Sequence, residues 1–363
     1  MTRTTEPPRG HARARTAALS RKQLLARMQC LPRAKVDITP TPLQDCTRLS
    51  EALGGPRILI KRDDLTGLAY GGTKTRSIGF MLGEAAAQGA DTVIVFGFAK
   101  LVSNHCRLVT AAAARLGMKP ILVLGGQGLR KEQSNAVLCH LVGAEIRLAD
   151  TEDVPTLGRL CNDMAAELRH AGHKPVVIGV DKFYSAYGAI GSVDCFLEIL
   201  DQLDDLHASA DYLYLCSQGG TQAGFVLASK ALQVPTRIVS ISSMPVGLRS
   251  WPGRVELHTD IAGWANDLAG LLGIDVSVDA FDVVNYPDYV GQGYGIMTPG
   301  CAEAIRLAAS TEGIILDPLY TGKGMAGLMD HIRSKRITAG ETVVFVHTGG
   351  LPTLFDYSAA LTA

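Results

Sequence analysis

Short apolar runs alternate with longer segments rich in alanine and leucine along most of the chain, and this alternation limits the folds open to it. Beyond residue 74, apolar runs rich in β-branched residues predict strands near 91–97, 119–124, 144–149, 175–180, 211–216, 236–242 and 341–347. Helical spacing of apolar residues predicts helices at 74–88, 104–117, 131–142, 155–171, 188–204, 221–232, 260–273, 300–312 and 323–335. Strands that alternate with helices form parallel sheets with helices on both faces, so the sequence predicts an α/β fold.

Two segments depart from this regular pattern. Residues 1–19 are rich in arginine, alanine, threonine and proline, and Glu6 is their only acid. The segment has no apolar centre, so we expect a disordered basic tail, with an organelle transit peptide as the alternative. After it, Ser20 and Gln23 fit a capping box at a helix start. Residues 244–298 show no clear period and predict loops that shape a pocket.

Charge and cysteine usage argue against several classes of function. The 363 residues carry 35 Lys and Arg against 35 Asp and Glu, so charge gives no case for a nucleic acid or membrane partner. No apolar run approaches the roughly 20 residues of a membrane span. The 8 cysteines and 9 histidines are scattered without zinc spacing. We therefore expect no metal site, and reduced thiols in a cytoplasmic protein.

One lysine stands in an unusual place. The apolar run 58–60 predicts a buried strand, a charged turn and the glycines Gly71 and Gly72 follow, and Lys74 then falls in the first turn of a helix. A helix N-terminus favours anions over cations, so this position lowers the pKa of an amine, as burial also does. A neutral amine is what Schiff-base chemistry needs. Lys74 is therefore a candidate nucleophile, with a solvated lysine at a helix start as the alternative; the two glycines before it, which let backbone approach a ligand closely, weaken that alternative.

Two other stretches join a predicted strand to a predicted helix. Residues 216–224 read Cys-Ser-Gln-Gly-Gly-Thr-Gln-Ala-Gly, and glycines at such a turn expose N–H groups that suit a phosphate. Ser103, Asn104 and His105 precede an alanine-rich helix. Ser103 fits a helix N-cap, and the N–H groups at that helix start suit a carboxylate.

Together these motifs resemble those of one enzyme family. Lys-Arg-Asp-Asp-Leu-Thr-Gly-Leu-Ala at 61–69 and Gly-Gly-Thr-Lys-Thr-Arg at 71–76 resemble the cofactor-lysine segment of the D-cysteine desulfhydrase and 1-aminocyclopropane-1-carboxylate (ACC) deaminase family. Gly-Gly-Thr-Gln-Ala-Gly at 219–224 is similar to the family's phosphate loop. These are pyridoxal 5'-phosphate (PLP) enzymes, and the resemblance covers about residues 30–360.

The resemblance implies an architecture. It predicts the tryptophan synthase β-like fold, which has two open, twisted, mostly parallel sheets flanked by helices. It implies a large PLP-binding domain from 20–76 and 191–363, a small domain at 77–190, and the cofactor in the cleft between them. A homodimer and a small amino-acid substrate are also expected from the resemblance.

It further implies roles for single residues. Lys74 would form the Schiff base and is a candidate base for the Cα proton, while Ser103 is a candidate acid or base. Asn104 would bind the 3-oxygen of the cofactor ring. The phosphate would sit on Gly219, Gly220 and Thr221, and Ser217 and Gln218 are further implied cofactor contacts. Thr348 would contact the ring nitrogen, and the implied substrate contacts are Ser103, Asn104, His105 and Thr321. Tyr294 and Tyr320 could transfer protons if nearby positive charge lowers the pKa of their phenols.

Two of these positions separate the branches of the family. ACC deaminases carry glutamate where Thr321 stands and leucine where Thr348 stands. A hydroxyl opposite the ring nitrogen makes a weaker electron sink than a carboxylate, and a weaker sink suits the loss of a good leaving group from Cβ. We therefore expect α,β-elimination on D-cysteine or cysteate, which releases sulfide or sulfite, pyruvate and ammonia.

The chain departs from the family pattern at four places. Thr73 replaces the asparagine before the lysine, and Ser77 replaces a basic phosphate ligand, with Arg76 and Lys100 as candidates to supply the missing charge. Residues 97–102 replace the usual Gly-Gly-Ile-Gln, and the usual Gly-Gly-Ser is absent around 180–183. These changes lead us to expect a substrate choice different from that of the best-known members. The alternatives are ACC deamination, β-replacement in specialised biosynthesis, and a catalytically weakened PLP-binding paralogue.

Overall fold

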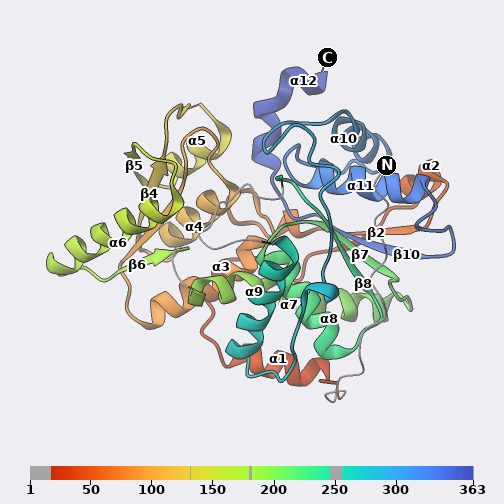
Figure 1. Cartoon of the computed structure of the whole chain (residues 1–363), viewed down its shortest axis with the longest axis horizontal. Helices are drawn as coiled ribbons and strands as arrows, with labels where there is room; N and C mark the ends of the chain where they lie inside the picture. Colours follow the sequence, from red (N-terminus) through yellow and green to blue (C-terminus); the bar gives the residue numbers. More distant parts are fainter. Residues whose placement is uncertain (1–17, 131, 180–181, 246–255, 363) are drawn as a thin grey trace.

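The computed structural model describes residues 18–130, 132–179, 182–245 and 256–362. Its helices and strands alternate as the sequence predicts, and they form two sheets (Figure 1). The strands are β1 Leu43–Asp45, β2 Arg57–Lys61, β3 Thr92–Phe98, β4 Lys119–Gly125, β5 Glu145–Ala149, β6 Pro175–Ile178, β7 Tyr212–Cys216, β8 Arg237–Ile241, β9 Val284–Tyr286 and β10 Thr342–Val346. The α-helices are α1 Arg21–Gln29, α2 Thr47–Leu53, α3 Lys74–Ala87, α4 Asn104–Arg115, α5 Ser134–Leu141, α6 Val154–His170, α7 Lys182–Asp205, α8 Gly220–Leu232, α9 Leu257–Leu271, α10 Pro299–Glu312, α11 Thr321–Arg333 and α12 Ser358–Thr362.

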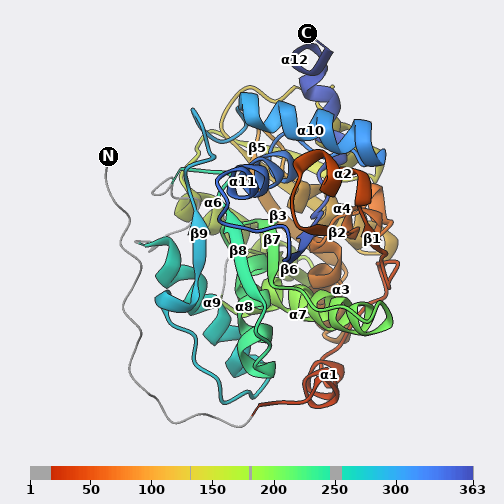
Figure 2. The same ribbon diagram turned by 90° about the vertical axis from the view of Figure 1, so that its right-hand side faces the viewer.

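The larger sheet has six strands in the order β1, β2, β10, β7, β8, β9. Neighbouring strands are parallel except for β1, which pairs with β2 in the antiparallel sense. Ile58 and Ile60 of β2 pack with residues of α2, α10 and α11, whereas Leu59 faces the core shared with α7 and α8. Helices therefore cover both faces of this sheet (Figure 2).

The smaller sheet has four parallel strands in the order β5, β4, β3, β6. Its face with Ile94 and Val123 packs against α6, while Val95 and Leu122 belong to the same core cluster as Leu59 of the larger sheet. One continuous core thus links the two sheets. The predicted domain boundaries fall inside α3 and α7, which contact each other, and the division into two domains stays a prediction.

A buried ion-pair network anchors α3 to α7. Arg76 is completely buried, and its guanidinium lies 2.8 Å from Asp63, 3.0 Å from Asp194 and 2.9 Å from Glu198. Lys61 at the end of β2 also pairs with Glu198. Because charges in a protein interior need partners, this network holds the first turn of α3, and with it Lys74, against α7.

The structure adds elements that the sequence pattern did not predict. Helices α2 and α12 and strands β1 and β9 were missed, and α7 begins before the predicted residue 188. The two strands have only three residues each, so their pairing with a neighbour defines them rather than any periodicity. Strand β9 lies within the aperiodic stretch 244–298.

The predicted helix start at Ser20 is confirmed, whereas the tail predicted for residues 1–19 stays a prediction. Ser20 and Gln23 form the predicted capping box of α1, and the Leu19 N–H donates to the Ala231 carbonyl at 2.9 Å. Residues 1–17 of the predicted tail lie outside the described residues. Residues 180 and 181, part of the segment 180–183 that lacks the family's Gly-Gly-Ser, also lie outside them.

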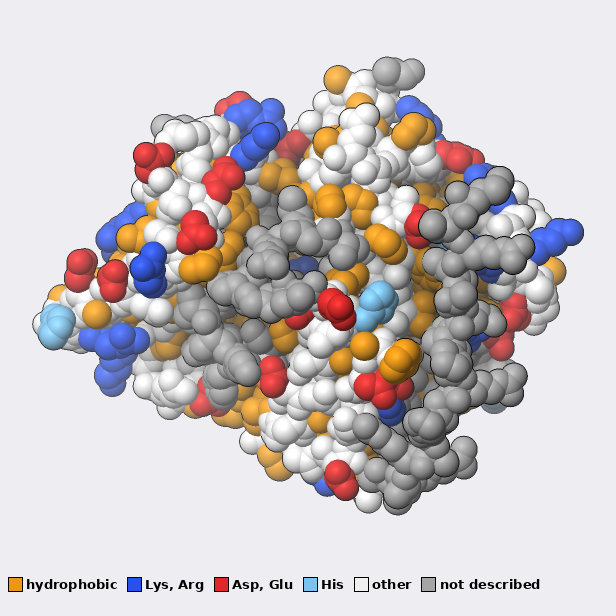
Figure 3. Space-filling model, viewed as in Figure 1, with side chains coloured by type: hydrophobic (Ala, Val, Ile, Leu, Met, Phe, Trp, Pro, Cys, Tyr) orange, Lys and Arg blue, Asp and Glu red, His pale blue; other side chains and the backbone are white. Residues whose placement is uncertain are grey.

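The described surface shows both signs of charge. Acidic and basic side chains are interspersed over the face in Figure 3, in keeping with the balanced composition. Among the described helices, none is both long and apolar enough to cross a membrane.

Candidate active site

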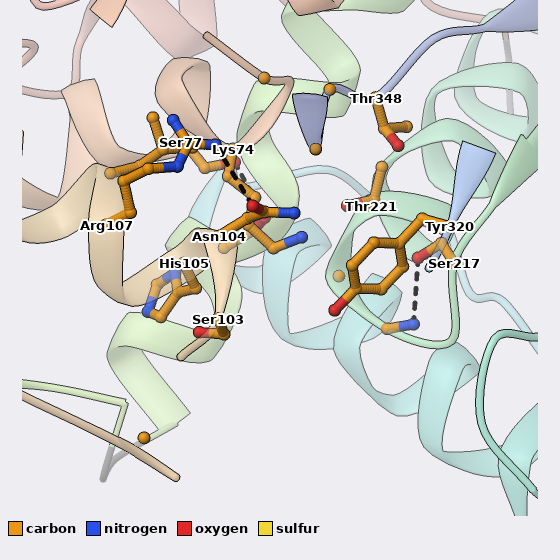
Figure 4. A pocket seen from close by; sticks show the side chains of 18 of the residues that line it. Lys74, Ser77, Ser103, Asn104, His105, Arg107, Ser217, Thr221, Tyr320 and Thr348 are labelled. Atoms are coloured by element: carbon orange, nitrogen blue, oxygen red, sulfur yellow. Dashed lines mark hydrogen bonds between the residues drawn. The ribbon is translucent and has the colours of Figure 1, made fainter. Parts of the chain in front are cut away.

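The loops at the carboxyl ends of the parallel strands enclose a cavity of about 370 Å³. Ligands bind at this edge in open α/β sheets because the loops there converge. The residues that line the cavity come from segments spread over most of the chain. They include Gly71, Gly72, Lys74, Ser77, Phe96, Phe98, Leu101, Ser103, Asn104, His105, Arg107, Ile178, Cys216, Ser217, Gln218, Gly219, Gly220, Thr221, Met244, Trp264, Tyr294, Tyr320 and Thr348. Figure 4 shows Ser103, Asn104, His105 and Arg107 on one side of it and Ser217, Thr221, Tyr320 and Thr348 on the other.

Lys74 is the first residue of α3 and reaches into this cavity. Burial lowers the pKa of its amine, and the charge of Arg107 lowers it further, while Cys216 and Asp317 act in the opposite sense. Its Nζ lies 5.7 Å from the centre of the Tyr320 ring. The low pKa inferred from the sequence is therefore confirmed in direction, with burial as its main cause.

The loop before Lys74 has an unusual backbone. Ala69 and Tyr70 have positive φ angles of 41° and 69°, which side chains rarely adopt, and Gly71 and Gly72 follow with positive φ. A Cβ on Gly72 would lie 3.1 Å from the Thr348 carbonyl oxygen. The loop thus packs backbone against backbone on the Thr348 segment, and the Thr73 N–H donates to the same carbonyl at 3.1 Å.

The predicted phosphate loop lies at the start of α8. The helix begins at Gly220, so the N–H groups of its first turn have no partner inside the helix and face the cavity end. A Cβ on Gly219 would lie 2.5 Å from Trp264, and one on Gly220 would lie 3.1 Å from Gly188 of α7. The glycines are therefore required by close packing as well as by ligand approach. Gln218 is tied to the 243–244 segment, because its side chain accepts from the Ser243 and Met244 N–H groups.

The triplet 103–105 opens α4 on the opposite side of the cavity. Ser103 is the N-cap, and its Oγ accepts from the Cys106 N–H at 3.2 Å. Burial lowers the pKa of His105 to about 4, with the Lys74 charge as a second cause. His105 is therefore neutral near pH 7, and the helix N-terminus, not an imidazolium, supplies the positive potential here.

Two tyrosines meet across the cavity. The hydroxyl oxygens of Tyr294 and Tyr320 lie 2.6 Å apart. Burial is the largest cause that raises the pKa of both phenols, and the Asp317 carboxylate raises it further. The condition set for proton transfer by these tyrosines, a pKa lowered by nearby positive charge, is not met, because burial raises the pKa instead. Near neutral pH both phenols keep their protons and can donate them.

Thr321 lies away from the cavity. Its side chain is completely buried, and its Oγ1 donates to Asp317 Oδ1 at 2.6 Å. The same carboxylate accepts from the backbone N–H groups of Leu319 and Tyr320. Asp317 thus organises the turn before α11, and Thr321 is part of that turn. Thr348, in contrast, does line the cavity.

The departures near Lys74 have local explanations. Ser77 Oγ donates to the Gly188 carbonyl at 2.8 Å and accepts from the Gly191 N–H at 3.1 Å, so the hydroxyl links α3 to α7. Arg76 is engaged in the buried ion-pair network, and Lys100 is exposed, so neither supplies the missing charge in the cavity. Thr73 Oγ1 is the only buried side-chain oxygen or nitrogen without a hydrogen-bond partner in the described part of the chain.

Sequence reasoning missed three residues around this site. Arg107 lies on α4 one helical turn after Ser103, and Trp264 of α9 packs on the phosphate loop. Lys323 is completely buried and donates to the carbonyls of Val290 and Gly293, the loop that carries Tyr294. The signal for Arg107 and Lys323 was a cation within the first turn of a helix, the same signal that singled out Lys74.

Comparison with known proteins agrees with this geometry. A family model described as "Pyridoxal-phosphate dependent enzyme" matches residues 35–349. The chain belongs to this family of pyridoxal-phosphate-dependent enzymes. The resemblance and the cofactor that the sequence analysis named are therefore confirmed.

Relatives within this family are similar over almost the whole chain. D-cysteine desulfhydrase of Salmonella schwarzengrund is 34% identical over 331 residues, which cover 90% of this chain and 96% of the relative. ACC deaminase of Burkholderia ambifaria is 35% identical over 340 residues, covering 91% and 98%. The crystal structure of an ACC deaminase homologue superposes with a TM-score of 0.81 at 35% identity, covering 94% of this chain and 98% of that one. A threonine deaminase of Solanum lycopersicum, 17% identical with a TM-score of 0.62 and coverage of 94% and 87%, shares the fold.

The residues that line the cavity suit PLP. The family's cofactor has a phosphate, a ring and an aldehyde carbon, and the cavity offers a helix N-terminus, apolar walls and an amine whose pKa is lowered. None of the described residues lining the cavity is an acid, which fits an anionic ligand. When bound, the cofactor supplies an electron sink for bonds at the Cα of an amino acid.

Proposed function

We propose that this enzyme is a lyase that catalyses α,β-elimination on a small amino acid, with D-cysteine or cysteate as the leading substrates. One observation carries the proposal. The Lys74 amine, the start of α4 and the Tyr294–Tyr320 pair line one cavity that has no acid among its described residues. A candidate base, a candidate carboxylate site and a candidate proton donor therefore lie together. The similarity to a D-cysteine desulfhydrase supports the same reading.

Each residue has a definite task in this proposal. Lys74 takes the proton from Cα, because burial lowers the pKa of its amine and so favours the neutral form that acts as a base. The N-terminal turn of α4, from Ser103 to His105, binds the substrate carboxylate. Tyr320 is hydrogen-bonded to Tyr294 and donates a proton to the sulfur that leaves Cβ. The raised pKa of the Tyr320 phenol keeps this hydroxyl protonated before the transfer. Pyruvate and ammonia then form when the released enamine is hydrolysed.

The choice between elimination and ACC deamination rests on two hydroxyls. Thr348 lines the cavity and is a neutral group. Thr321 stands at the position where ACC deaminases carry glutamate, and its hydroxyl is hydrogen-bonded to Asp317. We therefore place ACC deamination second. The similarity to an ACC deaminase keeps it in the test.

Assembly and location belong to the same proposal. We infer a homodimer in the cytoplasm, with no nucleic acid or membrane partner. The described cysteines are free thiols, and all except Cys30 are buried, which supports a reducing compartment. Light scattering on the purified protein gives the mass, and a monomeric mass contradicts the homodimer.

The first experiment is the absorption spectrum of the purified protein with PLP. D-cysteine, L-cysteine, cysteate and ACC are added in turn, and pyruvate, sulfide, sulfite and 2-oxobutyrate are measured. We expect a visible cofactor band that one sulfur amino acid changes, with release of pyruvate. Lys74→Ala should lose the band and the activity, while Lys22→Ala on the exposed side of α1 should keep both. 2-Oxobutyrate from ACC would instead establish the second candidate, and a band that no amino acid alters would indicate a weakened paralogue.

A further inference from the structure

Arg107 is a buried cation at the edge of the cavity, and none of its hydrogen-bond partners among the described residues is a carboxylate. Its side chain is only 1% exposed. Its Nη1 donates to the Ala69 carbonyl, and its Nη2 donates to the Gly71 carbonyl at 3.2 Å. Burial lowers its pKa to about 10, so the guanidinium stays charged near neutral pH. Buried charges usually pair with an opposite charge, but the hydrogen-bond acceptors around this guanidinium are neutral carbonyl and amide oxygens.

The same guanidinium contacts two asparagine side chains. Nε donates to Asn135 Oδ1 at 2.9 Å, and Nη2 donates to Asn104 Oδ1 at 3.4 Å. A guanidinium has donors only, so the atom of each amide that faces it must be the oxygen. This rule decides the orientation of both amides, which an asparagine by itself leaves open.

The orientation of the Asn135 amide in turn helps to fix that of Asn104. With its oxygen on Arg107, Asn135 has its Nδ2 free to donate, and it does so to the Val102 carbonyl at 2.9 Å and to Asn104 Oδ1 at 3.1 Å. Asn104 Oδ1 therefore accepts from two side chains. Its Nδ2 is the remaining polar atom of the amide, and Figure 4 shows Asn104 reaching from Arg107 into the cavity.

We infer that Arg107 and Asn135 are positioning residues that hold the Asn104 amide with its N–H toward the cavity, where it selects an oxygen acceptor on the bound cofactor. The acceptor is the 3-oxygen of the ring, so the inference rests on the proposed function and on the contact that the family resemblance implies for Asn104. Two donors on Oδ1 also polarise the amide and strengthen its N–H as a donor. The network discriminates between a ring that carries this oxygen and one that lacks it.

The test compares the affinities of the protein for PLP and for 3-deoxypyridoxal 5'-phosphate, which lacks the ring oxygen. Both dissociation constants are measured by equilibrium dialysis, and their ratio is the preference. One hydrogen bond to a charged acceptor corresponds to a preference of about tenfold or more. We expect the wild-type protein to show it, and Asn104→Ala to reduce it to near one.

The decisive variants are Arg107→Lys and Asn135→Leu. Each should reduce the preference several-fold, and Arg107→Lys should have no further effect in an Asn104→Ala background, because both act through the same amide. Asn104→Asp, which has no N–H to offer, should favour the deoxy analogue. Arg115→Lys, at the exposed end of the same helix, is the matched control and should leave the preference unchanged.

A purely structural role gives a different result. If Arg107 and Asn135 only support the 69–71 loop, both variants will weaken the two ligands equally and leave the preference at its wild-type value, which overturns the inference. A wild-type preference retained by Asn104→Ala also overturns it. Neither outcome bears on the proposed lyase activity, because that activity is tested separately by pyruvate release from the wild-type protein. Should Arg107→Lys fail to fold, Asn135→Leu still decides the question.

Discussion

At the scale of single residues, the site is defined by buried polar groups and by the partners they have. Lys74 and Arg107 line the cavity, and neither forms an ion pair with an acid among the described residues, whereas Arg76 pairs with Asp63 and two other carboxylates. Thr73 and Ser77 stand where the family carries an amide and a cation. Ser77 has both of its hydrogen-bonding functions satisfied by α7, but Thr73 Oγ1 has no partner.

Thr73→Val should therefore stabilise the cofactor-free protein. The substitution keeps the shape and removes a buried hydroxyl that lacks a partner, so the free energy of unfolding should rise by about 1 kcal/mol. Urea unfolding without PLP measures it. Thr66→Val is the matched control, because Thr66 Oγ1 accepts from the Gly72 N–H at 2.8 Å, and its loss should destabilise. A destabilised Thr73→Val protein would mean that the hydroxyl has a partner, such as water.

The residues that the sequence identified are those whose position follows from the strand and helix pattern. Lys74, Ser103 and Thr221 each come just after a strand or open a helix, and parallel strands bring their carboxyl ends to one edge. Thr321 matches the motif equally well, but its side chain turns to Asp317, four residues earlier. Which way a side chain turns depends on the local cap, and no spacing rule predicts that.

At the scale of elements, the site depends on how closely helices approach one another. Helices α7 and α8 are in contact through glycines, and a Cβ on Gly224 would lie 2.1 Å from the Ala189 carbonyl oxygen. Helix α8 therefore cannot move away from α7 without displacing the predicted phosphate loop at its start. Lys323 plays the corresponding part for α11, since it ties that helix to the loop carrying Tyr294.

Two glycine-to-alanine substitutions should have opposite effects. Gly224→Ala forces α8 away from a backbone carbonyl, so we expect a loss of stability of about 1–3 kcal/mol and weaker PLP binding. Gly263→Ala in α9 meets no atom within 4 Å, so helix propensity should stabilise it by about 0.5–1 kcal/mol. Thermal unfolding compares the pair. Equal effects would show that the contact between α7 and α8 adjusts freely.

Lys323→Met should separate catalysis from cofactor binding. The change removes both hydrogen bonds to the Val290 and Gly293 carbonyls, so the loop no longer holds Tyr294 on Tyr320. We expect kcat for pyruvate release to fall by about tenfold or more, because small losses of geometry are costly in catalysis, while PLP affinity changes little. Lys335→Met on the exposed surface is the control. An unchanged kcat would show that the loop is held by other contacts.

At the scale of the whole molecule, buried histidines link stability to pH. His331 is 1% exposed, its Nδ1 lies 2.7 Å from the Tyr214 hydroxyl, and the Tyr286 ring centre lies 4.6 Å from its own. Burial lowers the pKa of His331 to about 4. His105 has a similar pKa for the same reason. Both side chains are neutral in the folded protein at a pH where the unfolded chain already binds protons.

Acid should therefore destabilise the protein well above the pKa range of its carboxylates. The stability that the neutral side chains of His331 and His105 contribute is complete above the ordinary histidine pKa of 6.5. It is lost as the pH falls toward 4, because protons then bind preferentially to the unfolded chain. For one histidine the loss at pH 5 is about 2 kcal/mol. The slope of unfolding free energy against pH between 6.5 and 5 measures it. His331→Gln should flatten that slope, and an unchanged slope would contradict the assignment.

The larger sheet also has a consequence for the order in which the protein can fold. Strand β10 lies between β2 and β7, yet it is the last strand of the described chain to be synthesised. While the ribosome makes the residues in between, β2 and β7 have unpaired edges on apolar strands, and such edges recruit other chains. A message truncated before residue 342 should therefore yield aggregated protein rather than a smaller folded one.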